Sequence, residues 1–139
     1  MNSPRVAVVD TNVLVSGFLS PCGPPGRIVD WLRTGEIRAG VDDRILAEYR
    51  EVLHRSELGL PAREIEVVLH AIGRYALWAE VSPSASIGHL PDRDDAPFAE
   101  CALALNSCLV TGNKRHFPGS LLHGLNVVSP SEFIALIGR

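Results

Sequence analysis

Acidic residues are the first candidates for chemistry in this chain, because several of them stand beside apolar segments. Asp10 ends the apolar run "VAVV", and Glu48 lies within one turn of the apolar face of a predicted helix. Asp92, Asp94 and Asp95 stand at the mouth of a later helix. Like charges in one crevice repel unless a divalent cation neutralises them. Carboxylates with open coordination positions therefore predict a site for Mg²⁺ or Mn²⁺.

Each of these acids also has a structural interpretation. Asp10 can cap the helical turn that follows it, and Glu48 can be a solvated helix residue. Asp94 and Asp95 can stabilise the positive end of the next helix, and Asp92 can be a loop residue. The hypothesis of a cation site depends on the combination, since burying an unpaired carboxylate is costly.

Polar side chains accompany the acids at two predicted strand ends. Thr11 and Asn12 follow Asp10, and the "TGN" segment brings Thr111 and Asn113 to the end of another apolar run. Threonine hydroxyls can donate to a carboxylate or a phosphate, and an asparagine carbonyl can hold a ligand or a water. Turn chemistry explains the threonines nearly as well, so both interpretations stay open.

Four further residues near the same rim are candidates for contacts to phosphates. Arg93 lies between the acids, and Lys114, Arg115 and His116 follow the "TGN" turn. Such residues can hold a nucleic-acid backbone without reading its sequence. A solvated turn is the alternative interpretation.

These residues need a scaffold that brings distant segments together. Strand-like runs are predicted at 5–9, 37–41, 77–83, 107–112 and 125–129. Helices are predicted from 11 onward, at 26–35, at 42–55, from about 61 to 75, within 92–106 and at 129–138, with a loop at 21–26. Strands separated by helices predict an α/β fold with a mainly parallel sheet covered on both faces. Ligands of such sheets bind outside the carboxyl ends of the strands, where Asp10 and Thr111 fall.

Composition agrees with one packed domain over residues 1–139. Hydrophobic residues make up 46% of the chain and charged residues 21%, which excludes a disordered chain. The formal net charge of −3 does not by itself indicate a nucleic-acid binder, although a local patch matters more than the sum.

The apolar runs, the N-terminus and the cysteines indicate the cellular compartment of the protein. The apolar runs are shorter than the roughly 18 residues of a membrane span, and the N-terminus does not read as a signal peptide, so we expect a cytoplasmic protein. Cys22, Cys101 and Cys108 form no C-x-x-C pair, which argues against a disulfide framework or a zinc site. We predict three buried free thiols.

Four segments together resemble the PIN-domain family. They are "VVDTNVLVSGFL", "LAEYREVL", "PDRDDAPFAECALA" and "CLVTGNKRHF", in this order and spacing. The resemblance covers essentially the whole chain and is strongest to the VapC-like toxins of toxin–antitoxin pairs. It implies a three-layer α/β/α fold and a metal-dependent ribonuclease.

The resemblance also implies roles for individual residues. Asp10, Glu48 and Asp95 match acids of the family's active site, with Mg²⁺ or Mn²⁺ as the cofactor. Asp92 matches a supporting ligand, and Asn12 matches a polar residue that positions Asp10 or a water.

One departure from the family pattern concerns Asn113, because many members carry an acid at this place. Asparagine contributes no charge, so we expect one tightly held metal ion and a second that arrives with RNA. A catalytically weakened PIN-like binding module is therefore an alternative. A receiver-type phospho-acceptor domain is another, to which Thr111 and Lys114 fit loosely.

Partners are implied mainly by the resemblance. RNA is the expected substrate, a small antitoxin protein is the expected binding partner, and no membrane is involved. A homodimer fits the family likeness, with Leu58, Leu60 or Trp78 as exposed apolar contacts.

Overall fold

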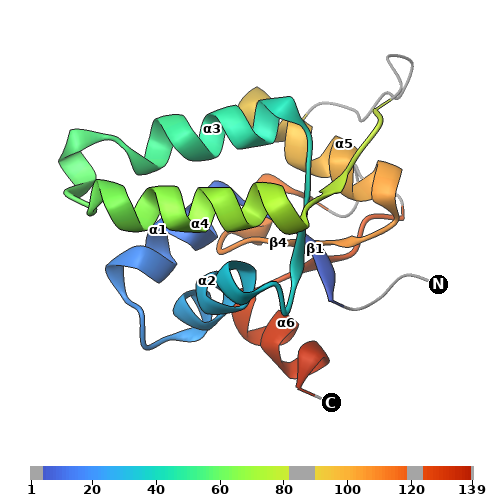
Figure 1. Cartoon of the computed structure of the whole chain (residues 1–139). Coiled ribbons are helices and arrows are strands. Elements are labelled where there is room, and N and C mark those ends of the chain that lie inside the picture. Colours follow the sequence, from blue (N-terminus) through green and yellow to red (C-terminus); the bar gives the residue numbers. More distant parts are fainter. Residues whose placement is uncertain (1–4, 82–89, 119–123, 139) are drawn as a thin grey trace.

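The computed structural model describes residues 5–81, 90–118 and 124–138, and the strands in this part of the chain form one sheet (Figure 1). Its five strands are β1 (Val6–Val9), β2 (Arg38–Val41), β3 (Leu77–Trp78), β4 (Cys108–Val110) and β5 (Val127–Val128). They lie in the order β3-β2-β1-β4-β5, and every neighbouring pair is parallel. The predicted parallel α/β sheet is confirmed.

Helices cover both faces of this sheet. They are α1 (Thr11–Leu19), α2 (Pro24–Thr34), α3 (Asp43–Leu53), α4 (Ala62–Tyr75), α5 (Ala96–Leu105) and α6 (Pro130–Ile137), with short 3₁₀ turns η1 (Ser56–Leu58), η2 (Arg93–Asp95) and η3 (Lys114–His116). The chain runs from β1 outward to β3 and then returns to β4, on the other side of β1. Because parallel crossovers are right-handed, α5 covers the face opposite to α2 and α4. The result is the expected α/β/α sandwich.

Local sequence signals set several helix ends. The carboxylate of Asp42 caps α3 by accepting the backbone N–H of Ile45 at 3.1 Å. Ser129 and Glu132 form a reciprocal capping box at the start of α6. Gly35 ends α2 at φ 83°, a left-handed conformation that glycine adopts without steric cost. These ends agree with the helices predicted to stop at 35 and to begin at 42 and 129.

The loop predicted at 21–26 is wrong in its second half. Pro24 and Pro25 form the first turn of α2, where a missing backbone N–H costs no hydrogen bond. Gly26 is buried in the same turn, and a Cβ there would lie 2.0 Å from the carbonyl oxygen of Pro21. Proline and glycine at these positions therefore start the helix and let it pass close to the preceding loop.

The strand predicted at 77–83 is shorter than expected. β3 has two residues, and the end of the predicted range lies outside the described residues.

The cysteine prediction is partly wrong. Cys101 is buried and Cys108 is partly buried, but Cys22 is exposed in the turn before α2. All three are free thiols. Among the described residues, no helix combines the length and the apolar character needed to cross a bilayer.

The core fixes the elements that carry the acidic residues. Ala7, Val8 and Val9 of β1 are fully buried. The rings of Tyr49 on α3 and Phe98 on α5 lie 6.3 Å apart between centroids. This aromatic contact packs α3 against α5 beside the central strand.

Candidate metal-binding active site

Asp10 lies at the point where the sheet reverses its order. Its backbone N–H donates to the carbonyl of Val110 at 2.9 Å, so it joins the carboxyl ends of β1 and β4. Ligands of open α/β sheets bind at such a switch point. Asp10 occupies the N-cap position of α1, and the backbone N–H groups of Thr11 and Asn12 help to lower the pKa of its carboxyl. The capping position therefore agrees with the structural interpretation, and it leaves this carboxylate free to serve a second role.

The carboxylate of Asp10 also accepts a hydrogen bond from the side chain of Thr111. The residue is only 5% exposed, and its Oδ2 accepts a hydrogen bond from Thr111 Oγ1 at 2.7 Å. The same threonine oxygen accepts the backbone N–H of Asn113 at 3.1 Å. Burial raises the pKa of Asp10, and the Thr111 hydrogen bond opposes this rise. The threonine therefore orients the carboxylate and favours its charged form.

This hydrogen bond gives a testable prediction. Thr111→Val keeps the shape of the side chain but removes the donor to a buried carboxylate, a bond worth about 1.5–3 kcal/mol. We expect the unfolding free energy in urea at pH 7 to fall by about this amount. Thr34→Val is the matched control, since Thr34 is exposed and donates only to a backbone carbonyl. Equal losses in both variants would contradict the role given to Thr111.

Glu48 comes to the same crevice from α3. Thr11 Oγ1 donates a short hydrogen bond to Glu48 Oε2. Glu48 is half-buried, and burial followed by the charges of Asp10 and Asp94 raises its pKa. It is not the fully solvated helix residue of the structural interpretation.

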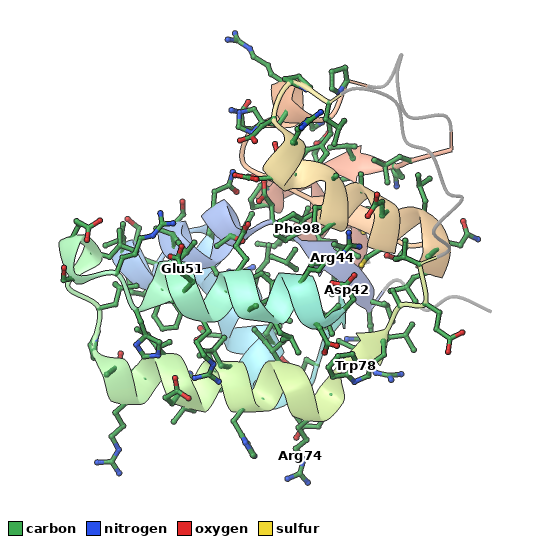
Figure 2. All side chains as sticks on the ribbon, turned by 90° about the horizontal axis from the view of Figure 1, so that it is seen from above. Asp42, Arg44, Glu51, Arg74, Trp78 and Phe98 are labelled. Carbon is green, nitrogen blue, oxygen red and sulfur yellow. The ribbon has the colours of Figure 1, made fainter. Side chains whose placement is uncertain are left out.

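Two contacts outside the crevice fix the position of α3. Tyr49 Oη donates to the carbonyl oxygen of Val9 at 2.5 Å, next to Asp10. Arg44 donates to Asp42 at 2.9 Å and to Glu100 of α5 at 2.6 Å, and Figure 2 shows Arg44 beside Asp42. The spacing of residues along the chain did not indicate these positioning contacts.

Asp95 lies in an environment that is unusual for a carboxylate with a purely structural role. It is 8% exposed at the end of η2, and its Oδ2 has no hydrogen-bond partner within residues 5–81, 90–118 and 124–138. His116 Nδ1 lies 3.0 Å from this oxygen but is not aligned for a hydrogen bond. Burial and then the charge of Asp10 raise the pKa of Asp95 to about 6, while His116 opposes the rise. Its side chain does not cap α5.

Asp92 and Asp94 are both exposed. Asp92 Oδ1 accepts the backbone N–H of Asp94 at 2.9 Å and thereby caps η2. The role of Asp92 as a supporting metal ligand stays a prediction. The charge of Asp94 acts on Glu48, so Asp94 belongs to the electrostatics of the crevice.

Asn12 and Asn113 are the two asparagines predicted at this rim. Asn12 Oδ1 accepts the backbone N–H of Gly112 at 3.2 Å and so joins α1 to the segment after β4. Asn113 is half-buried in that segment. Asn12 therefore holds the loop that carries Thr111.

The four predicted phosphate contacts differ in their surroundings. Arg93 and Arg115 are exposed. Lys114 is also exposed, but its Nζ lies 2.5 Å from Glu132 Oε1 of α6. His116 is half-buried and faces Asp95. Contact between any of them and phosphate stays a prediction.

The carboxylates of Asp10, Glu48 and Asp95 interact electrostatically, but their side chains do not already form a complete metal-binding site. The charge of Asp10 raises the pKa values of both Glu48 and Asp95. Within residues 5–81, 90–118 and 124–138, no three His, Cys, Asp or Glu side chains already stand at ligand spacing around one point. Mg²⁺ keeps several waters and is usually held by one or two carboxylates. A buried carboxylate oxygen of Asp95 that accepts no hydrogen bond from the described residues, in the field of the buried Asp10 carboxylate, fits such an ion.

A family comparison decides between the alternatives for this fold. The PIN domain profile matches residues 6–115, which is most of the chain. The chain belongs to the PIN domain family. PIN domains are generally nucleases that use divalent metal ions and act on RNA or DNA. The strand order 3-2-1-4-5 also differs from the 2-1-3-4-5 order of receiver-type domains, so the receiver alternative is wrong.

A curated relative extends over nearly the same length as this PIN domain. The uncharacterized protein MJ1680 of Methanocaldococcus jannaschii is 27% identical over 140 residues, covering 91% of this chain and 88% of that protein. Its name states no activity.

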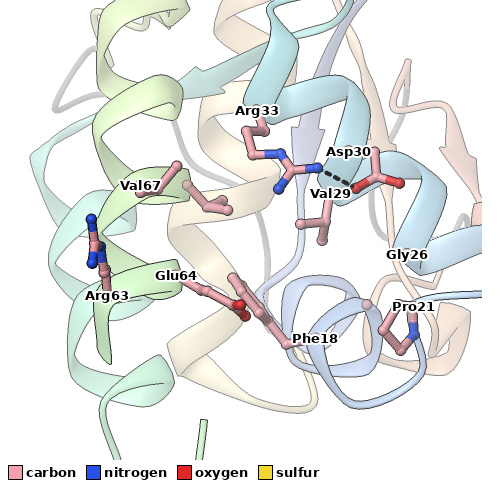
Figure 3. A pocket seen from close by; sticks show the side chains of 11 residues that line it. Phe18, Pro21, Gly26, Val29, Asp30, Arg33, Arg63, Glu64 and Val67 are labelled. Carbon is pink, nitrogen blue, oxygen red and sulfur yellow. Dashed lines mark hydrogen bonds and ion pairs between the residues drawn. The ribbon is translucent and has the colours of Figure 1, made fainter. Parts of the chain in front are cut away.

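A hollow of about 390 Å³ lies away from the acidic crevice (Figure 3). It is bordered by α1, α2 and α4, with Phe18, Val29 and Val67 as apolar lining. Asp30 and Arg33 form an ion pair of 3.1 Å at its edge. The hollow is therefore a second surface feature, separate from the candidate active site.

Proposed function

We propose that this PIN domain is a divalent-metal-dependent endoribonuclease that hydrolyses RNA phosphodiester bonds. The observation that carries the proposal is the buried Asp95 Oδ2, which has no hydrogen-bond donor among the described residues and whose carboxyl is raised in pKa by the charge of a second buried carboxylate, Asp10. Such an arrangement is unfavourable without a cation. The family supports a nuclease, and RNA as the substrate is our proposal.

The acids supply the metal ligands in this proposal. Asp10 and Asp95 hold one Mg²⁺ or Mn²⁺, and Glu48 contributes directly or through a water. Such an ion, when bound, lowers the pKa of a bound water and neutralises charge on the phosphate oxygens. Thr111 and Thr11 orient the carboxylates of Asp10 and Glu48.

The strand of RNA needs positive groups beside the crevice. Arg93, which lies between Asp92 and Asp94 in the chain, and Arg115, which precedes His116, are both exposed and are proposed to contact flanking phosphates. Lys114 has to leave Glu132 to make the same contact. These contacts hold the backbone without selecting a sequence.

The activity is tested with purified protein, a mixed RNA and single-stranded DNA of the same sequence, each with Mn²⁺, Mg²⁺ or EDTA. We expect cleavage of RNA with either ion and none with EDTA. Internal fragments will distinguish endonuclease from exonuclease action. Cleavage in EDTA would contradict metal dependence, and preference for DNA would contradict the substrate class.

Asn113 favours a second candidate function. The position carries an amide where many family members have an acid, which is consistent with a weakened PIN domain that only binds nucleic acid. This candidate predicts RNA binding without cleavage even when Mn²⁺ is supplied.

Asn113→Asp gives a direct prediction about this difference. Another carboxylate at the rim increases the negative charge available to a cation, so we expect tighter Mn²⁺ binding, by about tenfold. Calorimetric titration of the metal-free protein measures it. Unchanged affinity would place Asn113 outside the metal site, and Asn126→Asp, at an exposed position before β5, controls for added charge alone.

We propose further that the nuclease acts in the cytoplasm as the toxin of a toxin–antitoxin pair. The motif likeness to VapC-like toxins supports this role. Leu19 and Val67 are exposed large apolar residues, and Val67 also lines the hollow of Figure 3. A small antitoxin protein is proposed to cover part of this surface.

Growth arrest on expression tests the toxin role, and rescue by the product of the adjacent gene tests the antitoxin. Arrest by the Asp10→Asn variant as well would contradict toxicity through RNA cleavage.

A homodimer is a separate proposal. Of the predicted contacts, Trp78 is 50% exposed on the edge strand β3, whereas Leu58 and Leu60 are only partly exposed. Light scattering that gives the mass of one chain would contradict the dimer.

A further inference from the structure

His116 occupies an unexpected position for a residue that was predicted to contact RNA. Its Nδ1 lies 3.0 Å from Asp95 Oδ2, but the two atoms do not form a hydrogen bond. Asp95 Oδ2 is buried and has no hydrogen-bond partner in the part of the chain that the structure describes. The imidazole nitrogen and the carboxylate oxygen are therefore close without pointing at each other.

This geometry is typical of two ligands of one ion. Neighbouring ligands of an octahedral site, each about 2.1 Å from the ion, lie about 3.0 Å apart, and their lone pairs point toward the ion. A hydrogen bond would instead direct the N–H at the oxygen. The distance and the failed alignment both fit a shared cation beside Asp95 and His116.

The surrounding turn keeps His116 in this position. Its backbone N–H donates to the carbonyl of Asn113 at 3.2 Å, and the next residue, Phe117, is buried in the core. Lys114 is tied to Glu132 of α6. The imidazole therefore comes to Asp95 from a turn anchored on both sides.

We propose that His116 is a nitrogen ligand of the ion held by Asp10 and Asp95, an inference that rests on the proposed metal-dependent function. This role replaces the phosphate contact suggested by the sequence. Imidazole suits transition metals, whereas Mg²⁺ prefers oxygen ligands. The site therefore prefers Mn²⁺ to Mg²⁺.

The test uses metal-free full-length protein and MnCl₂ or MgCl₂ alone. Pulsed electron paramagnetic resonance of bound Mn²⁺ detects an imidazole nitrogen directly. We expect this nitrogen coupling in the unaltered protein, and we expect His116→Ala to lose it together with at least about tenfold in Mn²⁺ affinity. The affinity for Mg²⁺, measured by calorimetry, should fall less.

His54→Ala is the matched control, because His54 is paired with Glu66 on the surface. It should keep both the coupling and the affinity. His116→Gln serves as a second variant, with circular dichroism to confirm its fold, and should also lose the coupling.

Three results would overturn the proposal, and they differ in what they mean for the proposed nuclease. Mn²⁺ that binds in an Asp10-dependent manner without nitrogen coupling would exclude His116 as a ligand and leave the proposed nuclease intact. A His116→Ala protein with normal Mn²⁺ affinity but weaker RNA binding would also exclude His116 as a ligand. It would support instead the contact between His116 and phosphate that the sequence predicted. Absence of any Mn²⁺ binding would overturn both proposals.

Discussion

Asp10→Asn is expected to reduce metal-dependent RNA cleavage by at least about a thousandfold, equivalent to roughly 4 kcal/mol of transition-state stabilisation. The substitution keeps an oxygen that can accept the hydrogen bond from Thr111. It removes the charge that the proposed cation needs. A large effect on cleavage with little effect on folding is therefore the signature of a metal ligand.

Folding is measured on the same samples. Burial of the Asp10 carboxylate raises its pKa, so a neutral side chain should leave the metal-free protein at least as stable in urea at pH 7. Asp30→Asn is the control, because Asp30 is an exposed acid paired with Arg33. Full cleavage by the Asp10 variant, or an Asp30 variant that is equally inactive, would contradict the role of Asp10.

Asp95→Asn is expected to stabilise the metal-free protein at neutral pH. The pKa of Asp95 is about 6 in the folded chain, against about 3.9 in an unfolded chain. A raised carboxyl pKa favours the protonated folded state. Its stabilising contribution is complete below about pH 4 and is lost as pH rises through 6.

The size of this effect is about 1–2 kcal/mol, less than the full shift implies, because solvent screens a carboxyl group that is not completely buried. Urea unfolding in EDTA at pH 5 and pH 7.5 measures it. The unaltered protein should lose more stability over this interval than Asp95→Asn does. The raised pKa values of Asp10 and Glu48 act in the same direction in both proteins.

Divalent ions should reverse the difference in stability between the unaltered protein and Asp95→Asn. Mn²⁺ at pH 7.5 is expected to stabilise the unaltered protein more than the Asn variant, since binding to the folded state raises stability. An unaltered protein with the same pH dependence as Asp95→Asn would show that Asp95 ionises as an ordinary surface acid.

The fold could be predicted from the sequence because its signals are local. Buried strands read as apolar runs, and helices read as periodic faces with caps such as Asp42 and the Ser129–Glu132 box. The start of α2 was missed because prolines and glycines were interpreted only as loop residues. Their positions in a first turn depend on the close approach of Gly26 to Pro21.

The candidate site could be predicted only in outline. The position of Asp10 and Thr111 at two parallel strand ends predicted a common crevice, and the structure joins them by a hydrogen bond. Spacing along the chain could not show that Asn12 binds Gly112 or that His116 faces Asp95. These contacts depend on how the turn after β4 lies over η2, which is a tertiary property.

The central claim is that Asp10, Glu48 and Asp95 share one divalent cation. Crystals of the protein soaked in MnCl₂, with anomalous diffraction recorded near the manganese edge, test it most directly. We predict an anomalous peak about 2.1–2.3 Å from carboxylate oxygens of Asp10 and Asp95, with Glu48 in contact directly or through water. A fully occupied manganese bound elsewhere, with the Asp10 and Asp95 carboxylates left without an ion, would contradict the claim.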